Sequence, residues 1–429
     1  MSHTTFAGPG RQGGAVIVLV AVGIAALILC AALALDVGHT VLNKTRLQNT
    51  VDAAALAAAK ALDNTGDTTL ATAEAMQAFG SNAAAAGNSE LNTSYAGGSG
   101  DIQVTIEYSD TLPPFTPGSA TGPYVRVTAT GFTLPAWLAT VGGITEKTVA
   151  ASAVAGPRTL TVGSTVCNIA PMMVCGTPGA SPLWGYTLNS PQVLKKSTPG
   201  GQSQVGPGNF QLIQLGGSGA AIVRENMAGS FNTCLVGGST IQTQTGNEAG
   251  PVAQGLNTRF GQYTGPMSGQ QSTYPPDVIV DGQAPPLDAQ PRNGDPAQGY
   301  DVYQGSTQIT ASNIGQLYNY QDYEADVANP STYDYQPIQD GGTGAFGRRT
   351  LAVPVGNCTG TTNGQGSVPL LGFACFFLLQ PAQQKGNDSY VYGQFIQGCE
   401  VNGTPGPSPV AGSGPHIIQL YRNPGSTDS

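Results

Sequence analysis

The stretch that decides the fold runs from Gly13 to Leu62 and reads GGAVIVLVAVGIAALILCAALALDVGHTVLNKTRLQNTVDAAALAAAKAL. Residues 14–35 carry no charge and no strongly polar side chain. A membrane-spanning helix needs about 20 such residues, whereas the apolar core of a secretory signal has about 7–15. Length therefore predicts a transmembrane helix over residues 14–35, with residues 1–13 as a short cytoplasmic tail.

Two other interpretations of this segment stay open. Ala32-Leu33-Ala34 is an A-x-A triplet of the kind that signal peptidase cuts, which would make the segment a cleaved signal. Leu27-Ile28-Leu29-Cys30 resembles a lipoprotein signal, although a small residue is expected where Leu29 stands. Both alternatives predict a mature chain that begins after the apolar run or within it.

The helix is predicted to continue beyond the membrane. A helical face is formed by residues that recur at steps of four and three, namely Val37, Val41, Lys44, Gln48, Val51, Ala55, Ala58 and Leu62. Alanine at positions 53–55, 57–59 and 61 gives high helix propensity and allows close approach by another element. We expect this long helix to be an assembly element, although an anchor followed by an ordinary packed helix would show the same pattern.

The composition excludes one broad class of function. The chain has 429 residues, a net charge of −9 and only 16 Lys and Arg, with no basic stripe. Nucleic-acid binding depends on such a stripe, so we expect no nucleic-acid partner. Charged residues make up 10% of the chain, against a usual share of about 25%. This composition is typical of exported surfaces and assemblies.

Six of the seven cysteines lie beyond the apolar run and are predicted to form disulfides in an oxidising compartment. They are Cys167, Cys175, Cys234, Cys358, Cys375 and Cys399. Spacing suggests the pairs Cys167–Cys175 and Cys375–Cys399, although six thiols allow about 15 connectivities. The orientation of the span is a separate question. One positive charge, Arg11, precedes the span, and two, Lys44 and Arg46, follow it. Taken alone, these charges favour an N-terminus outside the cytoplasm, whereas the cysteines favour an N-terminus inside it. Because long domains translocate largely regardless of charge, we expect the N-terminus in the cytoplasm and the bulk outside.

The rest of the chain is predicted to be α+β. A second helix over residues 68–86, capped by Asp67 or Thr68, is followed by strands over 102–108, 124–132 and 146–156. A helix on a small antiparallel sheet is therefore expected over residues 36–156. Residues 157–429 are Gly- and Pro-rich and are expected to form a β-rich extracytoplasmic domain. Its predicted short strands include residues 220–226, and Val368–Leu379 is expected to be a central buried strand. A long Tyr-, Pro- and Gly-rich excursion is expected at about 262–335, with a helix over 310–329.

No catalytic motif is recognised. The three histidines, His3, His39 and His416, have no cysteine or carboxylate at ligand spacing. We therefore expect no catalytic, cofactor-binding or metal site and no small-molecule substrate. Tyrosines cluster at residues 300, 303, 318, 320, 323, 333 and 335. Tyrosine is enriched in interfaces, so Tyr318, Tyr320 and Tyr323 are candidates for an interaction patch, with packing of a long loop as the alternative.

The N-terminal region resembles the TadG-like proteins of Flp (tight-adherence, Tad) pilus assembly, with a TadE/TadG-like helix. The resemblance is carried by Arg11-Gln12-Gly13 before the span, Asp36-Val37-Gly38 at its exit and LQNTVDAAALAAAKAL (residues 47–62) after it. Segments such as CNIAPMMVCG (residues 167–176) extend the likeness toward the C-terminus. It implies a single-pass inner-membrane protein of the pilus apparatus whose bulk lies in the periplasm or outside the cell.

The sequence also departs from related families. Pilins and TadE-like pseudopilins carry a Glu soon after a prepilin-peptidase cut, whereas no Glu precedes Glu74 here. No D-x-S-x-S metal motif occurs either, although some TadG relatives carry one. We therefore expect a membrane-anchored structural or assembly component of a Flp pilus that catalyses no reaction. Its expected partners are the lipid bilayer and other Flp/Tad components. The alternative is a surface adhesin or envelope-binding module presented by the same anchor.

Overall fold

The structure is a computed structural model that describes residues 13–422 except 161–162, 182, 197–208, 230–233, 245–247, 296–298, 329–343, 360–365, 387, 402 and 405–413. Residues 1–12, which include His3 and most of the expected cytoplasmic tail, and Tyr333 and Tyr335 of the tyrosine cluster therefore lie outside the described residues. The chain divides into two units. Unit 1 comprises residues 1–58, 72–155 and 420–429, and unit 2 comprises residues 59–71 and 156–419.

One helix dominates unit 1. Helix α1 (Gly13–Thr65) has no Pro, and its alanine-rich second half has high helix propensity. Gly66 ends it in the left-handed conformation, with φ +66°. Helix α2 (Thr68–Ala83) follows, and the Asp67 carboxylate accepts the Thr69 backbone N–H at 2.6 Å, which confirms the predicted cap. The short helix α3 (Ser89–Tyr95) and the 3-10 turn η1 (Ala96–Gly98) lead into the sheet.

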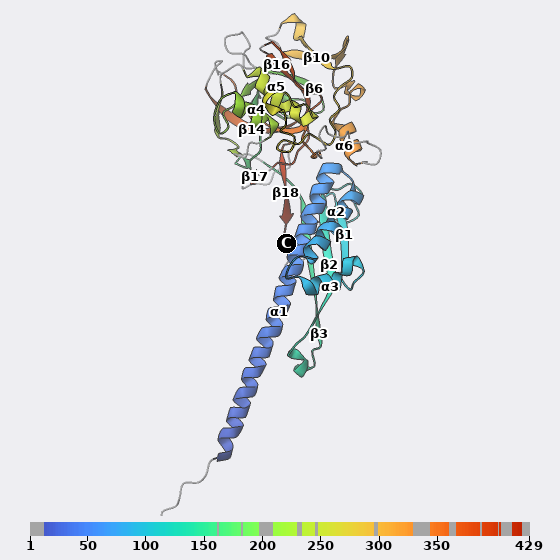
Figure 1. Cartoon of the computed structure of the whole chain (residues 1–429), viewed down its shortest axis with the longest axis vertical. Helices are drawn as coiled ribbons and strands as arrows, with labels where there is room; N and C mark the ends of the chain where they lie inside the picture. The colour runs from blue at the N-terminus through green and yellow to red at the C-terminus, as the bar shows by residue number, and fades with distance from the viewer. Residues whose placement is uncertain are drawn as a thin grey trace, which may run out of the picture. The chain divides into compact units, whose positions relative to one another are not determined.

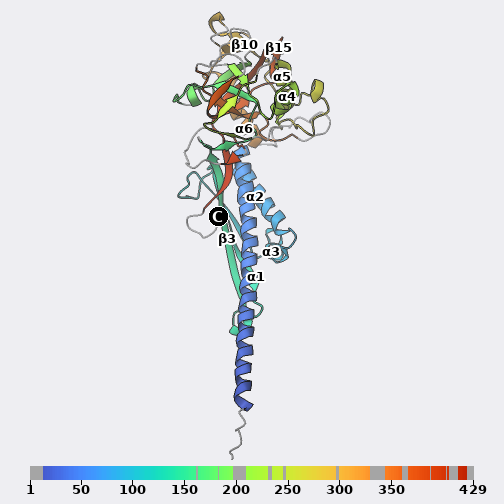
Figure 2. The same ribbon diagram turned by 90° about the vertical axis from the view of Figure 1, so that its left-hand side faces the viewer.

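The sheet of unit 1 is antiparallel in its first three strands, as the sequence predicts. Strands β1 (Gln103–Ser109), β2 (Tyr124–Pro135) and β3 (Glu146–Thr159) pair in chain order. Strand β18 (His416–Tyr421), whose last residues belong to unit 1, is the fourth strand of this sheet. The strands lie beside α1 in both views (Figures 1 and 2). The turn η2 (Ala139–Gly142) lies in the connection between β2 and β3.

Small side chains form the interface between α1 and this sheet. On the helix, Leu47, Val51, Ala54, Ala55 and Ala58 have no exposed surface. On the sheet, the fully buried residues are Val125, Val127, Ala129, Phe132, Ala153, Val154 and Ala155, most of them small. The Gln48 side chain donates to the Ser152 backbone carbonyl at 3.0 Å. On the predicted helical face, Val51, Ala55, Ala58 and Leu62 are buried, as the spacing predicts. Val37 and Val41 of the same predicted face are 44% and 59% exposed, because the covered face of this part of α1 passes through Asp36 and Asn43 instead.

Unit 2 is built on a mixed sheet whose strands close into a ring. Its order is β15-β16-β6-β7-β5-β13-β14-β9, and a further pairing joins β14 to β16. The ring therefore consists of β16 (Asp388–Ile396), β6 (Pro191–Lys196), β7 (Asn209–Leu212), β5 (Met172–Cys175), β13 (Thr350–Gly356) and β14 (Ser367–Leu378). Strands β15 (Gln383–Lys385) and β9 (Thr240–Gln242) extend it. The β6–β7 and β5–β13 pairs are parallel, and the other pairs are antiparallel.

The central strand β14 is buried on both faces, which explains its continuous apolar sequence. Ala374, Phe376 and Leu378 belong to one core cluster, to which helices α4 (Ala220–Ala228) and α5 (Ala249–Asn257) contribute. Residues 375, 377 and 379 belong to a second cluster on the opposite face, to which helix α6 (Tyr320–Ala328) contributes. Successive side chains of a strand point to opposite faces, so one sequence run supplies both cores. The predicted buried strand over Val368–Leu379 is confirmed.

Smaller elements complete unit 2. Strands β10 (Leu287–Pro291), β11 (Tyr300–Gln304) and β12 (Thr307–Ile309) form an antiparallel sheet within the segment expected to be irregular. Strands β4 (Thr165–Val166), β8 (Leu235–Val236) and β17 (Gly403–Thr404) form another. The 3-10 turns are η3 (Leu183–Gly185), η4 (Thr258–Phe260), η5 (Gly265–Met267), η6 (Arg292–Gly294) and η8 (Ile314–Gln316).

Two local predictions for unit 2 are wrong. Residues 220–226 form part of helix α4, not a strand, because Val223 and Met227 lie one turn apart and both face the core. Gly229 ends this helix with φ +108°, and its N–H bonds to the carbonyls of Glu225 and Asn226. The helix expected over residues 310–329 is shorter: a turn at η8 comes first, and α6 begins at Tyr320. The overall α+β class is confirmed.

Candidate functional site

Helix α1 contains the one segment of the described chain that is long and apolar enough to cross a membrane. Its large apolar side chains from Ile17 to Leu35 are each more than half exposed. Figure 1 shows this part of α1 extending past the sheet of unit 1. At about 1.5 Å rise per residue, residues 14–35 extend about 33 Å, close to the thickness of the hydrocarbon core of a bilayer. The exposed surface of this segment therefore matches the interior of a membrane.

A buried carboxylate marks the end of this segment. Asp36 is 2% exposed, and its two oxygens accept the backbone N–H groups of Trp137, Leu138 and Ala139, the first at 2.8 Å. These amides belong to the connection between β2 and β3, at the start of η2. The Trp137 N–H is the main cause of a pKa of Asp36 below its usual value. We call these contacts the Asp36 clamp, because one side chain holds three successive amides against the helix.

A second polar group lies one turn further along α1. The Glu90 carboxylate of α3 accepts the Asn43 side-chain N–H at 2.8 Å and lies 2.7 Å from His39 Nε2. The His39 ring stacks on the Trp137 ring, with centroids 4.3 Å apart. The clamp and this group lie on the face of α1 that continues as the buried Leu47, Val51 and Ala54. This face therefore holds α3 and the β2–β3 connection where α1 leaves its apolar segment.

The six predicted disulfide cysteines form three bridges in unit 2, namely Cys167–Cys234, Cys175–Cys358 and Cys375–Cys399. The suggested Cys167–Cys175 pair is wrong, and the Cys375–Cys399 pair is confirmed. Strand pairing explains both outcomes. Val166 lies opposite Leu235 in an antiparallel pair, so Cys167 follows directly toward Cys234. Cys175 lies opposite Gly356, two residues before Cys358.

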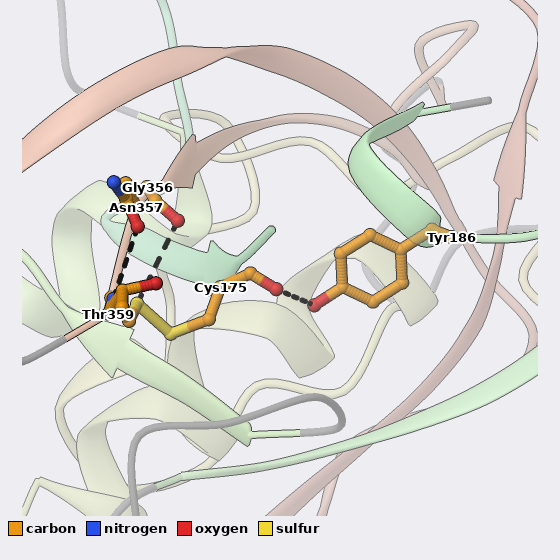
Figure 3. The surroundings of a disulfide bond; sticks show 6 residues. Cys175, Tyr186, Gly356, Asn357 and Thr359 are labelled. Atoms are coloured by element: carbon orange, nitrogen blue, oxygen red, sulfur yellow. Dashed lines mark hydrogen bonds between the residues drawn. A yellow bond between two sulfur atoms is a disulfide. The ribbon is translucent and has the colours of Figure 1, made fainter. Parts of the chain in front are cut away.

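The Cys175–Cys358 bridge lies beside a buried tyrosine. Figure 3 shows the Tyr186 hydroxyl donating to the Cys175 carbonyl, at 2.8 Å. Burial raises the pKa of Tyr186 well above its ordinary value, so this hydroxyl stays a proton donor at neutral pH. Cys30 is free and exposed within the apolar segment of α1. The three bridges therefore link strands and loops of unit 2, and all six of their cysteines are oxidised.

The candidate interaction patch of Tyr318, Tyr320 and Tyr323 belongs largely to the core of unit 2. Tyr323 is 4% exposed, and its ring lies 5.0 Å from the Phe377 ring. Tyr318 and Tyr320 are partly buried against the same cluster. The Tyr318 hydroxyl donates to the Asp326 carboxylate at 2.8 Å. A docking role for these residues stays a prediction, and their packing explains much of the tyrosine-rich sequence.

A buried ionic network lies next to Tyr323. Its hydroxyl lies 3.1 and 3.2 Å from the two carboxylate oxygens of Asp277, which also accept the N–H groups of Ile279 and Arg349. The Arg349 side chain has no exposed surface and donates to backbone carbonyls that include those of Leu378 and Leu379. Burial raises the pKa of Asp277 above its ordinary value, against the opposing effect of Arg349. The network satisfies groups that would be costly to bury unpaired.

A polar cavity of about 330 Å³ also lies in unit 2. Its ionisable lining residues include Lys60, Asp63, Arg259, Glu324, Arg348, Glu400 and His416. Many of these groups pair with one another or with backbone. His416 Nε2 lies 2.7 Å from Asp63, and Lys60 lies 3.0 Å from Glu400. The guanidinium groups of Arg259 and Arg348 donate to the carbonyls of Met227 and Pro275. The lining therefore contains two ion pairs and two arginines that are bound to backbone carbonyls.

The described residues do not assemble a metal centre, since no group of three His, Cys, Asp or Glu side chains in those ranges could hold an ion. His39 and His416 each pair with a single carboxylate. The Asp36 clamp was not predicted from the sequence. The sequence shows only an isolated carboxylate directly after an apolar run. The amides that bond to it lie about 100 residues away, and no local sequence pattern predicts such distant partners.

Comparison with family models gives two adjacent matches. Residues 13–61 match the Flp pilus-assembly TadE/G-like family, and residues 57–155 match the Tad-like Flp pilus-assembly family. The second match ends where unit 1 gives way to unit 2 at Gly156. No curated protein and no solved structure matches the chain. Over residues 13–155, which include α1, α2, α3 and most of the sheet of unit 1, the chain is therefore similar to the TadE/G-like and Tad-like proteins of Flp pilus assembly.

Proposed function

We propose that the protein is a membrane-anchored structural component of the Flp pilus apparatus. Residues 14–35 span the cytoplasmic membrane once, and the N-terminus lies in the cytoplasm. Unit 2 lies on the opposite side, in the periplasm or outside the cell. The observation that carries the proposal is the apolar segment of α1 in a chain of the Flp pilus-assembly family. Its large side chains from Ile17 to Leu35 are exposed, and water is a poor solvent for such a surface.

The three bridges support this orientation. Disulfides persist in oxidising compartments and are rare in the bacterial cytoplasm. Cys175 and Cys358 are 183 residues apart in sequence, so their bridge requires most of unit 2 to be on the oxidising side. The flanking charges Lys44 and Arg46 favour the other orientation, but long domains translocate largely regardless of charge. We therefore give the cysteines more weight than the flanking charges.

We also propose that the protein catalyses no reaction and acts by contact with other pilus components. The polar cavity of unit 2 supports this view, because His416 and Lys60 each pair with a carboxylate and its two arginines bond to backbone carbonyls. A panel of hydrolase substrates tests whether the protein catalyses a reaction. Turnover by the wild-type protein that is lost in Asp63→Asn or His416→Gln would overturn the proposal that it catalyses none.

Membrane fractionation and intact mass together test the anchor. The full chain is expected to stay with the membrane after alkaline carbonate extraction, with a mass that includes residues 14–35. A mature chain that begins after Ala34 and appears in the soluble fraction would reject the anchor. A reporter enzyme active only outside the cytoplasm, fused at the C-terminus, tests orientation.

A genetic test addresses the assembly role. Cells that lack the protein are expected to lose surface Flp pili, and the full chain should restore them. A chain with residues 14–35 replaced by a cleavable signal should restore few or none. Replacement of the same residues by an unrelated apolar helix is the matched control. If the control restores pili, the segment acts as an anchor alone, whereas normal pili in cells without the protein would reject the role.

A further inference from the structure

The connection between β2 and β3, residues 136–145, carries exposed apolar side chains, and we call it the hairpin tip. Trp137 is 53% exposed, Leu138 39% and Ile144 48%. Among the described residues of unit 1, the other large apolar side chains with comparable exposure all lie on α1 between Ile17 and Leu42. The described part of unit 1 therefore has two exposed apolar surfaces. One is α1 from Ile17 to Leu42, and the other is the hairpin tip.

The Asp36 clamp fixes the level of the tip along the helix. Asp36 directly follows the apolar run, so a bilayer that covers residues 14–35 ends at this residue. The amides of Trp137, Leu138 and Ala139 bond to its carboxylate, which places the start of η2 at the same height. Figures 1 and 2 both show the β2–β3 connection beside α1 where the helix leaves the sheet.

The burial of one residue of α1 indicates that the covered face of the helix extends past Asp36 into the apolar run, toward the bilayer centre. Ala32 lies one turn before Asp36 on the same face, about 6 Å closer to the bilayer centre at about 1.5 Å per residue. It is 7% exposed, whereas its neighbours Leu33 and Leu35 are 64% and 53% exposed. The covered face of α1 therefore begins within the apolar run and passes through Asp36 to Asn43.

The chemistry of the tip fits the boundary between lipid headgroups and acyl chains. Tryptophan concentrates at that boundary, since its ring is largely apolar and its N–H seeks a polar partner. Glu146 and Lys147 follow at the start of β3, so charge returns directly after the apolar residues. Lys147 can extend its ammonium toward phosphate groups while its stem stays against apolar surface.

We propose that the hairpin tip is a second membrane contact, inserted into the outer headgroup region beside α1. Trp137, Leu138 and Ile144 enter the lipid, and the Asp36 clamp holds them at the correct depth. This inference rests on the proposed anchor and names a further lipid-binding surface of the same unit. Two attachment points would fix the rotation of α1 about its own axis, which a single helix leaves free.

The two tryptophans of the chain, Trp137 and Trp184, allow a direct test. The purified full chain is reconstituted into phosphatidylcholine and phosphatidylglycerol vesicles, with bromine atoms placed on the acyl chains either near the headgroup or near the chain end. Bromine quenches tryptophan emission on contact. The emission of Trp137 is obtained as the difference between the wild-type protein and Trp137→Phe, which leaves Trp184 and its packing unchanged.

The expected result is a blue-shifted Trp137 emission that shallow bromines quench more than deep ones, with little quenching of Trp184 in Trp137→Phe. Leu138→Ser with Ile144→Ser should reduce the Trp137 quenching. Alkaline carbonate extraction of the same vesicles reports the anchor separately. Release of the chain overturns both the anchor and this proposal, whereas a retained chain with unquenched Trp137 overturns only the hairpin contact. A Trp137 that is blue-shifted but unquenched assigns the surface to protein, such as a second copy, and also overturns it.

Discussion

Replacing Tyr323 by Phe should destabilise unit 2 while leaving its shape intact. The ring is buried and packs 5.0 Å from the Phe377 ring, a contact that Phe preserves. The substitution removes a hydroxyl that donates to the buried Asp277 carboxylate and accepts the Gly347 N–H at 3.1 Å. A hydrogen bond to a charged group contributes about 1.5–3 kcal/mol. Asp277 keeps its bonds from Ile279 and Arg349, so we expect a loss in unfolding free energy near the lower end of that range.

Urea unfolding followed by Trp184 emission, in a Trp137→Phe background, measures this loss. The midpoint should fall while the slope with urea stays unchanged, because the surface exposed on unfolding is the same. Tyr303→Phe is the matched control: Tyr303 is half-buried on β11, and its variant should lie within about 0.5 kcal/mol of the parent. A Tyr323→Phe variant as stable as this control would refute the role given to the hydroxyl.

The pH dependence of the same variant adds a second check. Burial raises the pKa of Asp277, so its contribution to stability is present at low pH and is lost as pH rises through the folded-state pKa. The Tyr323 hydroxyl favours the charged form and opposes that loss. The deficit of Tyr323→Phe should therefore be larger at neutral pH than in acid. A deficit that grows on acidification would contradict this reasoning.

The buried ring also affects how a docking role for the tyrosines can be tested. Tyr323→Ser removes the ring as well, and large-to-small core substitutions of aromatic residues cost about 3–5 kcal/mol. Loss of a partner after such a change would therefore report unfolding and not docking. Tyr320→Phe and Tyr318→Phe keep the rings and change only the hydroxyls, so they are better probes of a contact surface.

Three further predictions follow from the structure. Replacing both Cys175 and Cys358 by Ala should lower the unfolding free energy of unit 2 by about 5 kcal/mol, against about 3 kcal/mol for Cys375 and Cys399, because the sequence separations are 183 and 24 residues. Urea unfolding measures both, Cys30→Ala should change nothing, and the reverse order would contradict the loop argument. Because the pKa of Asp36 is lowered, its contribution is present above the ordinary value of 3.8 and is lost as pH falls through the folded-state pKa. The protection of the Trp137–Ala139 amides against hydrogen exchange, measured relative to the intrinsic exchange rate at each pH, should thus fall in acid, and in Asp36→Ala at neutral pH, whereas unchanged protection would disprove the clamp. Ala55→Leu should cost about 1–3 kcal/mol by overpacking the helix–sheet interface, while Ala57→Leu, at a half-buried position, should cost clearly less in thermal unfolding, and equal costs would argue against this interface.

The periodicity of apolar residues predicted those helices and strands whose own sequence has a clear apolar spacing. The long helix, the second helix with its Asp67 cap and the three strands of unit 1 appear where apolar spacing placed them. The strand at Val368–Leu379 was predictable because a strand buried on both faces has a continuous apolar run. Helix α4 was predicted as a strand because a short apolar run flanked by glycines suits either structure.

The sequence by itself determined the anchor-like segment and the α+β class, because both depend on composition or on local periodicity, and its N-terminal motifs carried the likeness to Flp pilus-assembly proteins. Only the tertiary structure decided the disulfide pairs, the burial of Tyr323 and the partners of Asp36. Strand register chooses which cysteines meet, and register is set by contacts between residues far apart in sequence. For the same reason, three amides about 100 residues away reach the one carboxylate at the end of the apolar run.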